Sequence, residues 1–211
     1  DIFIPISVGG GIKSLRDIEN VLRAGADKVF INSAAIKSPK FLTEASKKFG
    51  SANICLSIEA VKNYNNEFIC LSNYGRELTN KKLPEWFEEA QERGVGEVII
   101  TSVSCDGIGN GFDKEILELV YDKINVPFIF HGGAGSEQQI YEVLKFEKVS
   151  GVAISSLIHY SLIRKKNFEF ELKSEGNTEF LKSFKDKINY KKSDILSIKK
   201  FLKKKGIDIR L

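Results

Sequence analysis

The sequence is poor in the residues that build metal centres and disulfide scaffolds. Its 211 residues include two histidines, three cysteines, four prolines and no methionine. The cysteines form no Cys-x-x-Cys motif and cannot all pair, which argues against a secreted disulfide scaffold and favours a reducing cytoplasm. Because the histidines and cysteines are scattered, no zinc pattern is present, and we expect neither a metal nor a cofactor. No apolar run approaches the ~18 residues that cross a bilayer, so we expect no membrane association.

Charge is distributed unevenly along the chain. The last 51 residues carry 15 Lys and Arg against 7 Asp and Glu, whereas residues 1–160 carry 17 against 21. A basic tail can mark a nucleic-acid partner. This tail shows no regular interleaving of aromatic with basic residues, so a solvated helix surface is favoured and no nucleic-acid partner is expected.

Short apolar runs alternate with longer amphipathic stretches. The predicted strands are Ile2–Val8, Lys28–Ile31, Asn53–Ile58, Glu97–Ser102, Pro127–Phe130 and Gly151–Ser155. The predicted helices are Leu15–Ala24, Pro39–Phe49, Leu83–Arg93, Lys114–Lys123 and Glu137–Phe146. This alternation predicts six βα units around a parallel sheet, and the near-continuous apolar strands predict a sheet covered on both faces.

Two segments break this rhythm. Residues 61–75 predict a β-hairpin with an Asn-Asn turn, and residues 161–192 are polar and lysine-rich without a period, as in an insertion. A last helix is expected at residues 194–205, capped by Ser193 and ended by Gly206.

The chain also repeats part of itself. Residues 5–23 align without gaps on residues 127–145, and after one inserted residue Val29–Ser33 aligns on Val152–Ser156. Two βα units near the start of the chain are therefore similar in sequence to two βα units near its end. In a barrel, such a repeat predicts a pseudo-twofold relation between two halves.

A glycine-rich turn joins a strand to a helix in both repeats. The turns lie at residues 9–11 and 132–135, where backbone N–H groups can approach a phosphate beside a helix N-terminus. A tight turn is the alternative explanation of one such loop, but two related loops favour an elongated ligand with a phosphate at each end. The turns and the polar strand ends that follow them give the expected phosphate-site residues, which are Gly10, Gly11, Asn32 and Ser33, and Gly132, Gly133, Ser155 and Ser156.

Three titratable side chains lie where predicted strands end. Glu59 closes its strand, and Asp106 follows the strand at residues 97–102 and opens a glycine-rich loop. Carboxylates at the carboxyl ends of parallel strands are the usual acids and bases of β/α barrels, although Asp106 can equally form an Asp-Gly turn. His131, directly before Gly132, either contacts a substrate or makes a structural hydrogen bond.

At these residues the chain resembles the cyclase subunit of imidazole glycerol phosphate synthase. The matching stretches are IPISVGGGI (4–12), RAGADKVFINSAA (23–35), FGSANICLSIEA (49–60), RGVGEVIITS (93–102), DGIGNGFD (106–113), GGAGS (132–136) and KKKGIDIRL (203–211). The resemblance spans the chain except residues 161–192. The INSAA motif and the KGIDIRL ending distinguish it from the sister isomerase of the same pathway.

The resemblance implies a (β/α)₈ TIM barrel whose third strand is the first strand here. Residues 1–211 are then expected to form a single barrel domain lacking the first two βα units, with an insertion at 161–192 before the last helix. The chain starts at Asp1 without a methionine, and we expect it to be incomplete at its N-terminus. A barrel lacking two strands has open edges, expected at residues 2–8 and 151–155, so we expect an open barrel or poor folding.

The resemblance also implies a lyase reaction of histidine biosynthesis. The family converts a formimino ribonucleotide bearing two phosphates, together with ammonia, into imidazole glycerol phosphate and an aminoimidazole carboxamide ribonucleotide. The ammonia comes from a partner glutaminase, which docks at the opposite end of the barrel. A heterodimer with a glutaminase subunit is therefore implied.

Individual positions carry over from the family. Glu59 falls on the fifth-strand general acid/base, which is an aspartate there, and Asp106 falls on an active-site aspartate. Lys28 and Glu97 match a charged ammonia gate, and Asp27 matches a residue that faces the glutaminase. The phosphate-site matches are Gly11, Asn32 and Ser33 for one site and Gly107, Gly133, Ser155 and Ser156 for the other.

Three departures from the family leave alternatives open. Glu59 is one methylene longer than the aspartate, His131 replaces a small residue, and residues 161–192 are foreign. These changes fit cyclase-like proteins that act with glutaminase-like partners to amidinate a sugar for surface polysaccharides. A non-catalytic phosphate- or glutaminase-binding module is a second alternative.

Overall fold

The computed structural model describes residues 3–165 and 190–210. The elements in chain order are β1 (Ser7–Gly9), α1 (Leu15–Arg23), β2 (Lys28–Ile31), α2 (Ser33–Lys37), α3 (Lys40–Phe49), η1 (Ser51–Asn53), β3 (Ile54–Lys62), β4 (Phe68–Ser72), β5 (Glu77–Lys82), α4 (Leu83–Glu92), β6 (Glu97–Ser102), α5 (Lys114–Val120), η2 (Tyr121–Lys123), β7 (Phe128–His131), α6 (Glu137–Leu144), β8 (Gly151–Ala153), α7 (Ser156–Lys165) and α9 (Ile195–Lys204). The predicted insertion at 161–192 lies largely outside the described residues.

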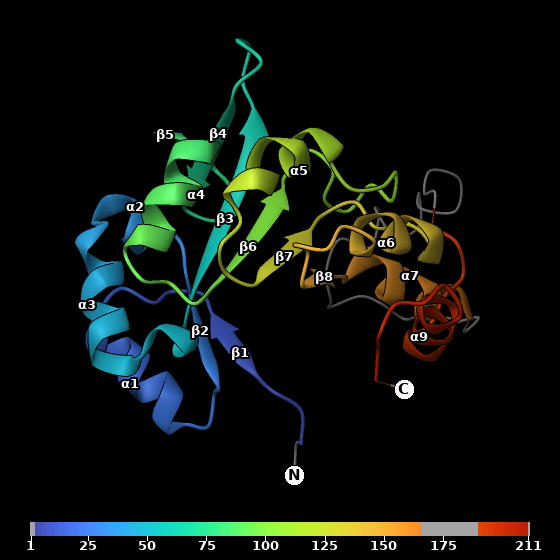
Figure 1. Ribbon diagram of the computed structural model, residues 1–211, viewed down its shortest axis with the longest axis horizontal. Coiled ribbons are helices and arrows are strands. Elements are labelled where there is room, and N and C mark those ends of the chain that lie inside the picture. The colour runs from blue at the N-terminus through green and yellow to red at the C-terminus, as the bar shows by residue number, and fades with distance from the viewer. Residues whose placement is uncertain (1–2, 166–189, 211) are drawn as a thin grey trace, which may run out of the picture.

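Parallel strands form the centre of the molecule. The order is β1-β2-β3-β6-β7-β8, and every neighbouring pair along this path is parallel. In Figure 1 the strands fan through the middle, with α1, α3 and α4 on one side and α6, α7 and α9 at the other end. This curled sheet with alternating helices confirms the prediction of a partial (β/α)₈ barrel.

Within the described residues, β1 and β8 each pair with one neighbouring strand. They are the strands at which the sequence predicted open edges. An unpaired strand edge exposes backbone N–H and C=O groups that can template association with another chain.

Alternation along the strands divides the sheet into two faces. On one face Val29, Ile58, Ile100 and Phe130 are fully buried and belong to one core with Leu42 of α3 and Trp86 and Phe87 of α4. Because successive strand residues point to opposite sides, the intervening residues occupy the second face, called here the inner face. The inner face carries Lys28, Cys55, Glu59, Glu97, Thr101 and His131.

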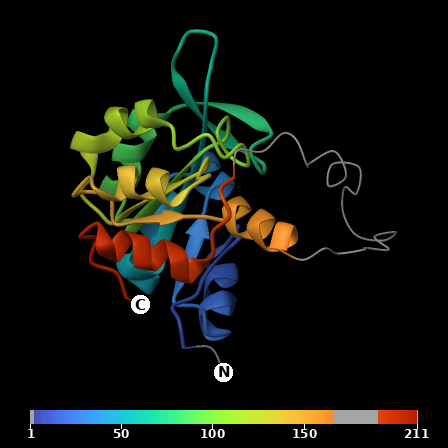
Figure 2. The same ribbon diagram turned by 90° about the vertical axis from the view of Figure 1, so that its right-hand side faces the viewer.

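A hairpin extends β3 beyond the parallel sheet. β3 pairs antiparallel with β4 from Glu59–Leu71 to Lys62–Phe68, which confirms the predicted hairpin. Its tip projects beyond the sheet in Figures 1 and 2. β5, which pairs with β4, was not predicted, and β3 continues four residues beyond its predicted end. Glu59 therefore lies inside a nine-residue strand rather than at its end.

The last helix has a different cap from the predicted one. Asp194, not Ser193, is the N-cap of α9, and its carboxylate accepts a hydrogen bond from the Ser197 N–H while the Ser197 hydroxyl accepts from the Asp194 N–H. Ser193 instead donates from its hydroxyl to Glu137. Gly206 follows the helix with φ of 87°, as predicted for the residue beyond the C-cap.

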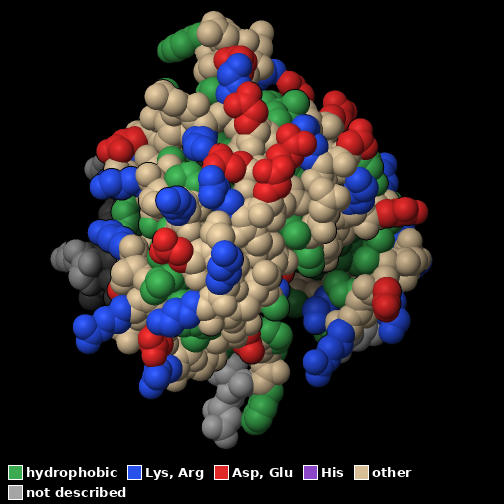
Figure 3. Space-filling model, turned by 60° about the vertical axis from the view of Figure 1, so that its left-hand side comes forward, with side chains coloured by type: hydrophobic (Ala, Val, Ile, Leu, Met, Phe, Trp, Pro, Cys, Tyr) green, Lys and Arg blue, Asp and Glu red, His purple; other side chains and the backbone are tan. Residues whose placement is uncertain are grey.

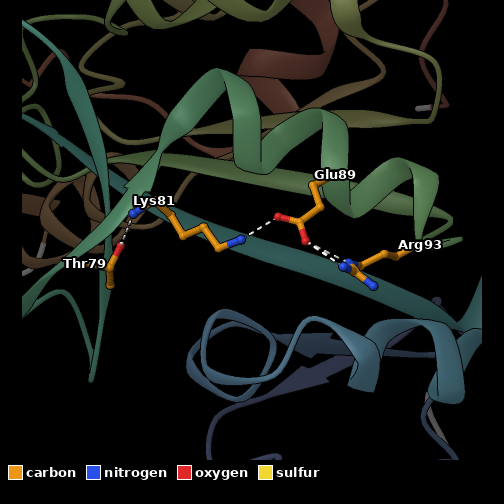
Figure 4. Close-up of polar contacts among 4 residues, drawn as sticks. All are labelled: Thr79, Lys81, Glu89 and Arg93. Atoms are coloured by element: carbon orange, nitrogen blue, oxygen red, sulfur yellow. Dashed lines mark hydrogen bonds and ion pairs between the residues drawn. The ribbon is translucent and has the colours of Figure 1, made fainter.

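A charged cluster fastens β5 to α4. The Glu89 carboxylate accepts from Lys81 at 2.5 Å and from Arg93 at 2.7 Å, and Figure 4 shows it between the two cations. The Lys81 ammonium also lies 4.7 Å from the centre of the Trp86 ring. The cluster ties the extra strand to the helix whose apolar face packs into the core.

The outer helical face carries mixed charge. Lys and Arg side chains are interspersed with Asp and Glu over the side seen in Figure 3. Glu19 of α1 forms ion pairs with Arg23 of the same helix and with Lys48 of α3. No helix in the described part of the chain is both long and apolar enough to span a membrane.

Candidate active site

Strand register brings predicted site residues into one row. Glu59 of β3 is paired with Thr101 of β6, and Thr101 is paired with His131 of β7. All three lie on the inner face near the carboxyl edge of the parallel sheet. This edge is where β/α barrels place their active sites, because every strand-to-helix loop opens there.

Glu59 is half-buried and held from two sides. Its Oε2 accepts a hydrogen bond from Asn32 Nδ2 at 3.1 Å, and its carboxylate accepts another from the Gly75 backbone N–H. Burial raises the pKa of Glu59, while these two hydrogen bonds act in the opposite direction. The negative charge of Asp106 raises that pKa further. A carboxyl group with a raised pKa keeps its proton to a higher pH than a free glutamate does, which suits a general acid/base.

His131 lies between Asp106 and Thr101. Its Nδ1 is 3.0 Å from the Thr101 hydroxyl, and its Nε2 is 3.9 Å from Asp106 Oδ1. The histidine therefore makes a structural hydrogen bond on one ring nitrogen and turns the other toward the predicted site carboxylate. The structure thus shows the structural hydrogen bond that was one of the two interpretations of His131. The other interpretation, contact with a substrate, stays a prediction.

The first glycine turn is open to solvent. Gly10 and Gly11 are exposed and have φ of 93° and 75°. The turn leads into α1, where Ser14 and Asp17 form a reciprocal capping box. These backbone conformations favour glycine and leave the loop backbone accessible to an anion.

Asn32 and Ser33 lie at the end of the neighbouring strand. The Ser33 hydroxyl accepts a hydrogen bond at 2.9 Å from the backbone N–H of Asn73, which belongs to the β4–β5 turn. Asn73, Tyr74 and Gly75 all have positive φ, at 50°, 62° and 71°. This turn therefore reaches Ser33 of the first predicted phosphate site and Glu59 of the predicted acid/base site.

The second glycine turn is tightly packed. Gly132 and Gly133 are buried, with φ of 95° and 102°. A Cβ on Gly133 would come within 2.0 Å of the Gly111 carbonyl oxygen, so a larger residue cannot fit. The Gly133 carbonyl also accepts from the Gly111 N–H at 2.8 Å. Packing thus requires glycine here, whether or not this turn also binds phosphate.

The other second-site residues lie in the loops after the two strands beside β7, which are β6 and β8. Gly107, with φ of 74°, lies in the loop after β6. Ser155 and Ser156 lie where β8 passes into α7, and the Ser155 carbonyl accepts the first helical hydrogen bonds from Ile158 and His159. The structure therefore brings both predicted groups to the carboxyl edge of the sheet, one beyond β1 and β2 and the other beyond β6 to β8.

Three residues at this edge were not predicted from the sequence. Asn73 and Gly75 reach the site from the β4–β5 turn, and the local sequence pattern did not predict this turn. Tyr190 packs against Gly109 in the loop after β6, where an added Cβ would meet its ring at 2.9 Å. The Asn-Tyr-Gly triplet was a turn signal that could have located the first two, whereas no local signal marks Tyr190.

The predicted gate residues meet at the opposite edge. Lys28 Nζ donates to Glu97 Oε2 at 2.6 Å, and the Cys55 thiol donates to Glu97 Oε1 at 3.5 Å. The hydrogen bond from Lys28 to Glu97 raises the pKa of Lys28. Glu97 is buried and has lost hydrogen bonds to water. The hydrogen bonds from Lys28 and Cys55 compensate this carboxylate for that loss.

Asp27 lies beside this gate and is exposed. Its Oδ2 accepts at 2.7 Å from the Ile6 backbone N–H, just before β1. The contact gives Asp27 a structural role, and a role facing a glutaminase remains a prediction. No group of three or more His, Cys, Asp or Glu among residues 3–165 and 190–210 is arranged to hold a metal ion.

Residues 1–164 match the model of the family described as "Histidine biosynthesis protein". The chain is 39% identical over 176 residues to the imidazole glycerol phosphate synthase subunit HisF of Parabacteroides distasonis, covering 83% of this chain and 69% of the relative. It is 41% identical over 176 residues to HisF of Helicobacter hepaticus, with the same coverage. HisF of Staphylococcus saprophyticus matches at 39% identity over 75% of this chain and 63% of its own length.

Proposed function

The chain belongs to the histidine biosynthesis protein family, as a sequence of the HisF cyclase type, and on that premise we propose that its carboxyl edge binds a formimino ribonucleotide by both phosphates and closes its imidazole ring with ammonia. The observation that carries the proposal is the joint placement of Glu59, Asp106 and His131 between two glycine-rich turns. The aligned region spans 62% to 70% of the relatives' lengths.

The two turns would hold the two ends of the substrate. Gly10, Gly11, Asn32 and Ser33 are proposed to bind one phosphate, and Gly107, Gly132, Gly133, Ser155 and Ser156 are proposed to bind the other. Backbone N–H groups and hydroxyls donate hydrogen bonds to phosphate, and the start of α7 adds partial positive charge. An elongated ligand fixed at both ends would place its central atoms over the row of Glu59, Thr101 and His131.

Glu59 and Asp106 are proposed to move the protons of ring closure. Ammonia must lose protons as its nitrogen forms new bonds to carbon, and the departing groups must gain protons. The raised pKa of Glu59 suits a group that alternates between the two states. Asp106 would be the second proton-transfer group, and its Oδ1 lies 3.9 Å from His131 Nε2.

Ammonia is proposed to arrive from a glutaminase subunit at the opposite edge of the sheet. Lys28 and Glu97 form an ion pair on the inner face there, between that edge and the proposed chemistry. The reported relatives favour this function over amidination of a surface sugar, because each is named a subunit of the histidine-pathway synthase.

The test is turnover by the protein supplied with an ammonium salt and the bis-phosphate formimino ribonucleotide. We expect release of imidazole glycerol phosphate, and a loss of at least about 100-fold in kcat for Glu59→Gln, because the amide keeps the shape but cannot exchange the proton. Glu67→Gln, on the hairpin, is the matched control and should retain activity. Binding of the ribonucleotide without turnover would reject the cyclase reaction and leave a binding function.

A further inference from the structure

Two side chains in the described part of the chain bond to the Glu97 carboxylate, one to each oxygen. Lys28 Nζ donates to Oε2 at 2.6 Å, and the Cys55 thiol donates to Oε1 at 3.5 Å. A thiol is a weak donor and an ammonium a strong one, so Lys28 supplies the larger share of the stabilisation. Because the two donors use different oxygens, Glu97 keeps one hydrogen bond when the other donor leaves.

Strand pairing fixes Cys55 beside Glu97. Cys55 of β3 is the direct partner of Glu97 at the start of β6, and both side chains belong to the inner face. Cys55 is fully buried. Its side chain is short and starts from a strand that is paired on both sides, so the thiol stays beside Glu97 unless the strand itself moves.

Lys28 is the donor that can leave. Its side chain is 32% exposed, whereas the side chain of Glu97 is 11% exposed. The long, flexible side chain of a lysine can keep its ammonium in water while its stem lies on apolar surface. Water can therefore replace Glu97 as the partner of the Lys28 ammonium, but it cannot equally replace Lys28 at the more deeply buried carboxylate.

The free energy of separating Lys28 from Glu97 depends on what remains at the carboxylate. A buried carboxylate without a donor is costly, because it has lost its hydration and gained nothing in return. A hydrogen bond that remains on Oε1 lowers the free energy of the separated state. Burial raises the pKa of Cys55 to about 12, and the Glu97 charge acts in the same direction, so the thiol keeps its proton at neutral pH and can donate.

We propose that Cys55 is a positioning residue of the ammonia gate, whose thiol stays bonded to Glu97 while Lys28 moves aside to let ammonia pass. The proposal rests on the proposed function and adds to it a residue from outside the Lys28–Glu97 pair. Cys55 lowers the free energy that opening requires and takes no part in ring closure.

The experiment compares two sources of ammonia. Turnover of the bis-phosphate formimino ribonucleotide is measured with glutamine and the glutaminase subunit, and separately with a saturating ammonium salt. We expect Cys55→Val to lower the glutamine-dependent rate about tenfold and to leave the ammonium-dependent rate near that of the unmodified protein. More glutamate should be released for each imidazole glycerol phosphate formed, because ammonia that cannot pass is lost to solvent. Cys55→Ser keeps a donor at this position and should recover most of the glutamine-dependent rate.

Two further variants separate this role from a structural one. Cys70→Val is the matched control, because Cys70 is also a fully buried thiol but lies on β4, paired with Ala60 near the far end of β3. It should leave the ratio of the two rates unchanged. Cys55→Ala removes the donor without adding volume, so it should lower this ratio as Cys55→Val does even if valine disturbs the packing.

The same ratio of the two rates in the unmodified protein, Cys55→Val and Cys55→Ala would overturn the proposal and leave the proposed function in place. A loss that Cys55→Ser does not recover would overturn it as well, because packing rather than the hydrogen bond would then be responsible. If the unmodified protein does not turn over the ribonucleotide with the ammonium salt, the proposed function fails and this inference fails with it.

Discussion

The Asn32 amide donates to the Glu59 carboxylate across 3.1 Å and so joins the first proposed phosphate site to the proposed acid/base group. Asn32 directly precedes α2, and Glu59 lies on the adjacent strand β3. A phosphate that binds at Asn32 and Ser33 would therefore act on a side chain already bonded to Glu59. If the proposed function holds, this one amide would couple substrate binding to proton transfer.

The first prediction concerns the acidic limb of the pH–rate profile. Activity that needs the Glu59 carboxylate should fall as pH decreases through the raised pKa of that group. Asn32→Ala removes a hydrogen bond that favours the carboxylate, so the limb of kcat should move to higher pH. Asp106→Asn removes a negative charge that raises the pKa, so the limb should move to lower pH.

The measurement is kcat against pH at saturating ribonucleotide and ammonia for the three proteins. Rates for both variants will be lower, but the positions of the limbs remain comparable. Shifts in the same direction for both variants would contradict the assignment of the limb to Glu59.

The second prediction concerns the gate. Glu97→Gln removes the charge that compensates Lys28 at the amino edge of the sheet. An unpaired, partly buried ammonium reorganises its surroundings, so we expect glutamine-dependent turnover with the glutaminase subunit to fall about tenfold. Turnover with a saturating ammonium salt should change much less, because free ammonia can reach the carboxyl edge directly.

The matched control for the gate is Glu118→Gln, on the exposed side of α5. It should preserve the ratio of glutamine-dependent to ammonia-dependent turnover. An equal loss of both activities in Glu97→Gln, with an unchanged melting temperature, would count against a route for ammonia past Lys28.

The architecture could be predicted from the sequence because its determinants are local. The runs at Lys28–Ile31 and Glu97–Ser102 became strands with the predicted bounds. A buried parallel strand shows a continuous β-branched pattern, and the order of strands and helices then favours a barrel. The surroundings of Glu59 were harder to predict. The strand that contains Glu59 continues into a hairpin, and this hairpin lies outside both copies of the internal repeat.

Contacts between distant segments account for what the sequence could not show. Asn73 bonds to Ser33 across 40 positions, and Tyr190 packs against Gly109 across an even longer separation. Neither contact produces a periodic pattern in the sequence from which it could be predicted. The repeat revealed the glycines of both turns, but not that packing against Gly111 alone already requires glycine at position 133.

The third prediction concerns stability and uses Glu89. Although partial burial opposes it, hydrogen bonds from Lys81 and Arg93 hold the pKa of Glu89 below its usual value. A depressed folded-state pKa contributes stability above the unfolded-state pKa, and this contribution is lost as pH falls through the folded-state value. Glu89→Gln should lower the Tm by about 2–4 °C at neutral pH, for a loss of about 1 kcal/mol.

Thermal melts at a series of pH values check this prediction. The Tm difference between Glu89→Gln and the unmodified protein should shrink as the pH falls below about 4. Glu92→Gln, an exposed glutamate on the same helix, should show little difference at any pH. A Tm gap for Glu89→Gln that persists in acid would mean that packing, rather than charge, is lost.

The last prediction concerns the three thiols. Burial raises the pKa of Cys55 to about 12, with the Glu97 charge adding to the effect, and burial raises the pKa of Cys70 to about 12 as well. Cys105 is partly exposed in the loop after β6. Since the thiolate is the reactive form, iodoacetamide at mildly alkaline pH should alkylate Cys105 and spare the other two in the folded protein. Intact-mass spectrometry should find one adduct before denaturation and three after it, and none before it in Cys105→Ser. Rapid native alkylation of Cys55 would show that the gate opens to solvent and that its thiol is not held against Glu97.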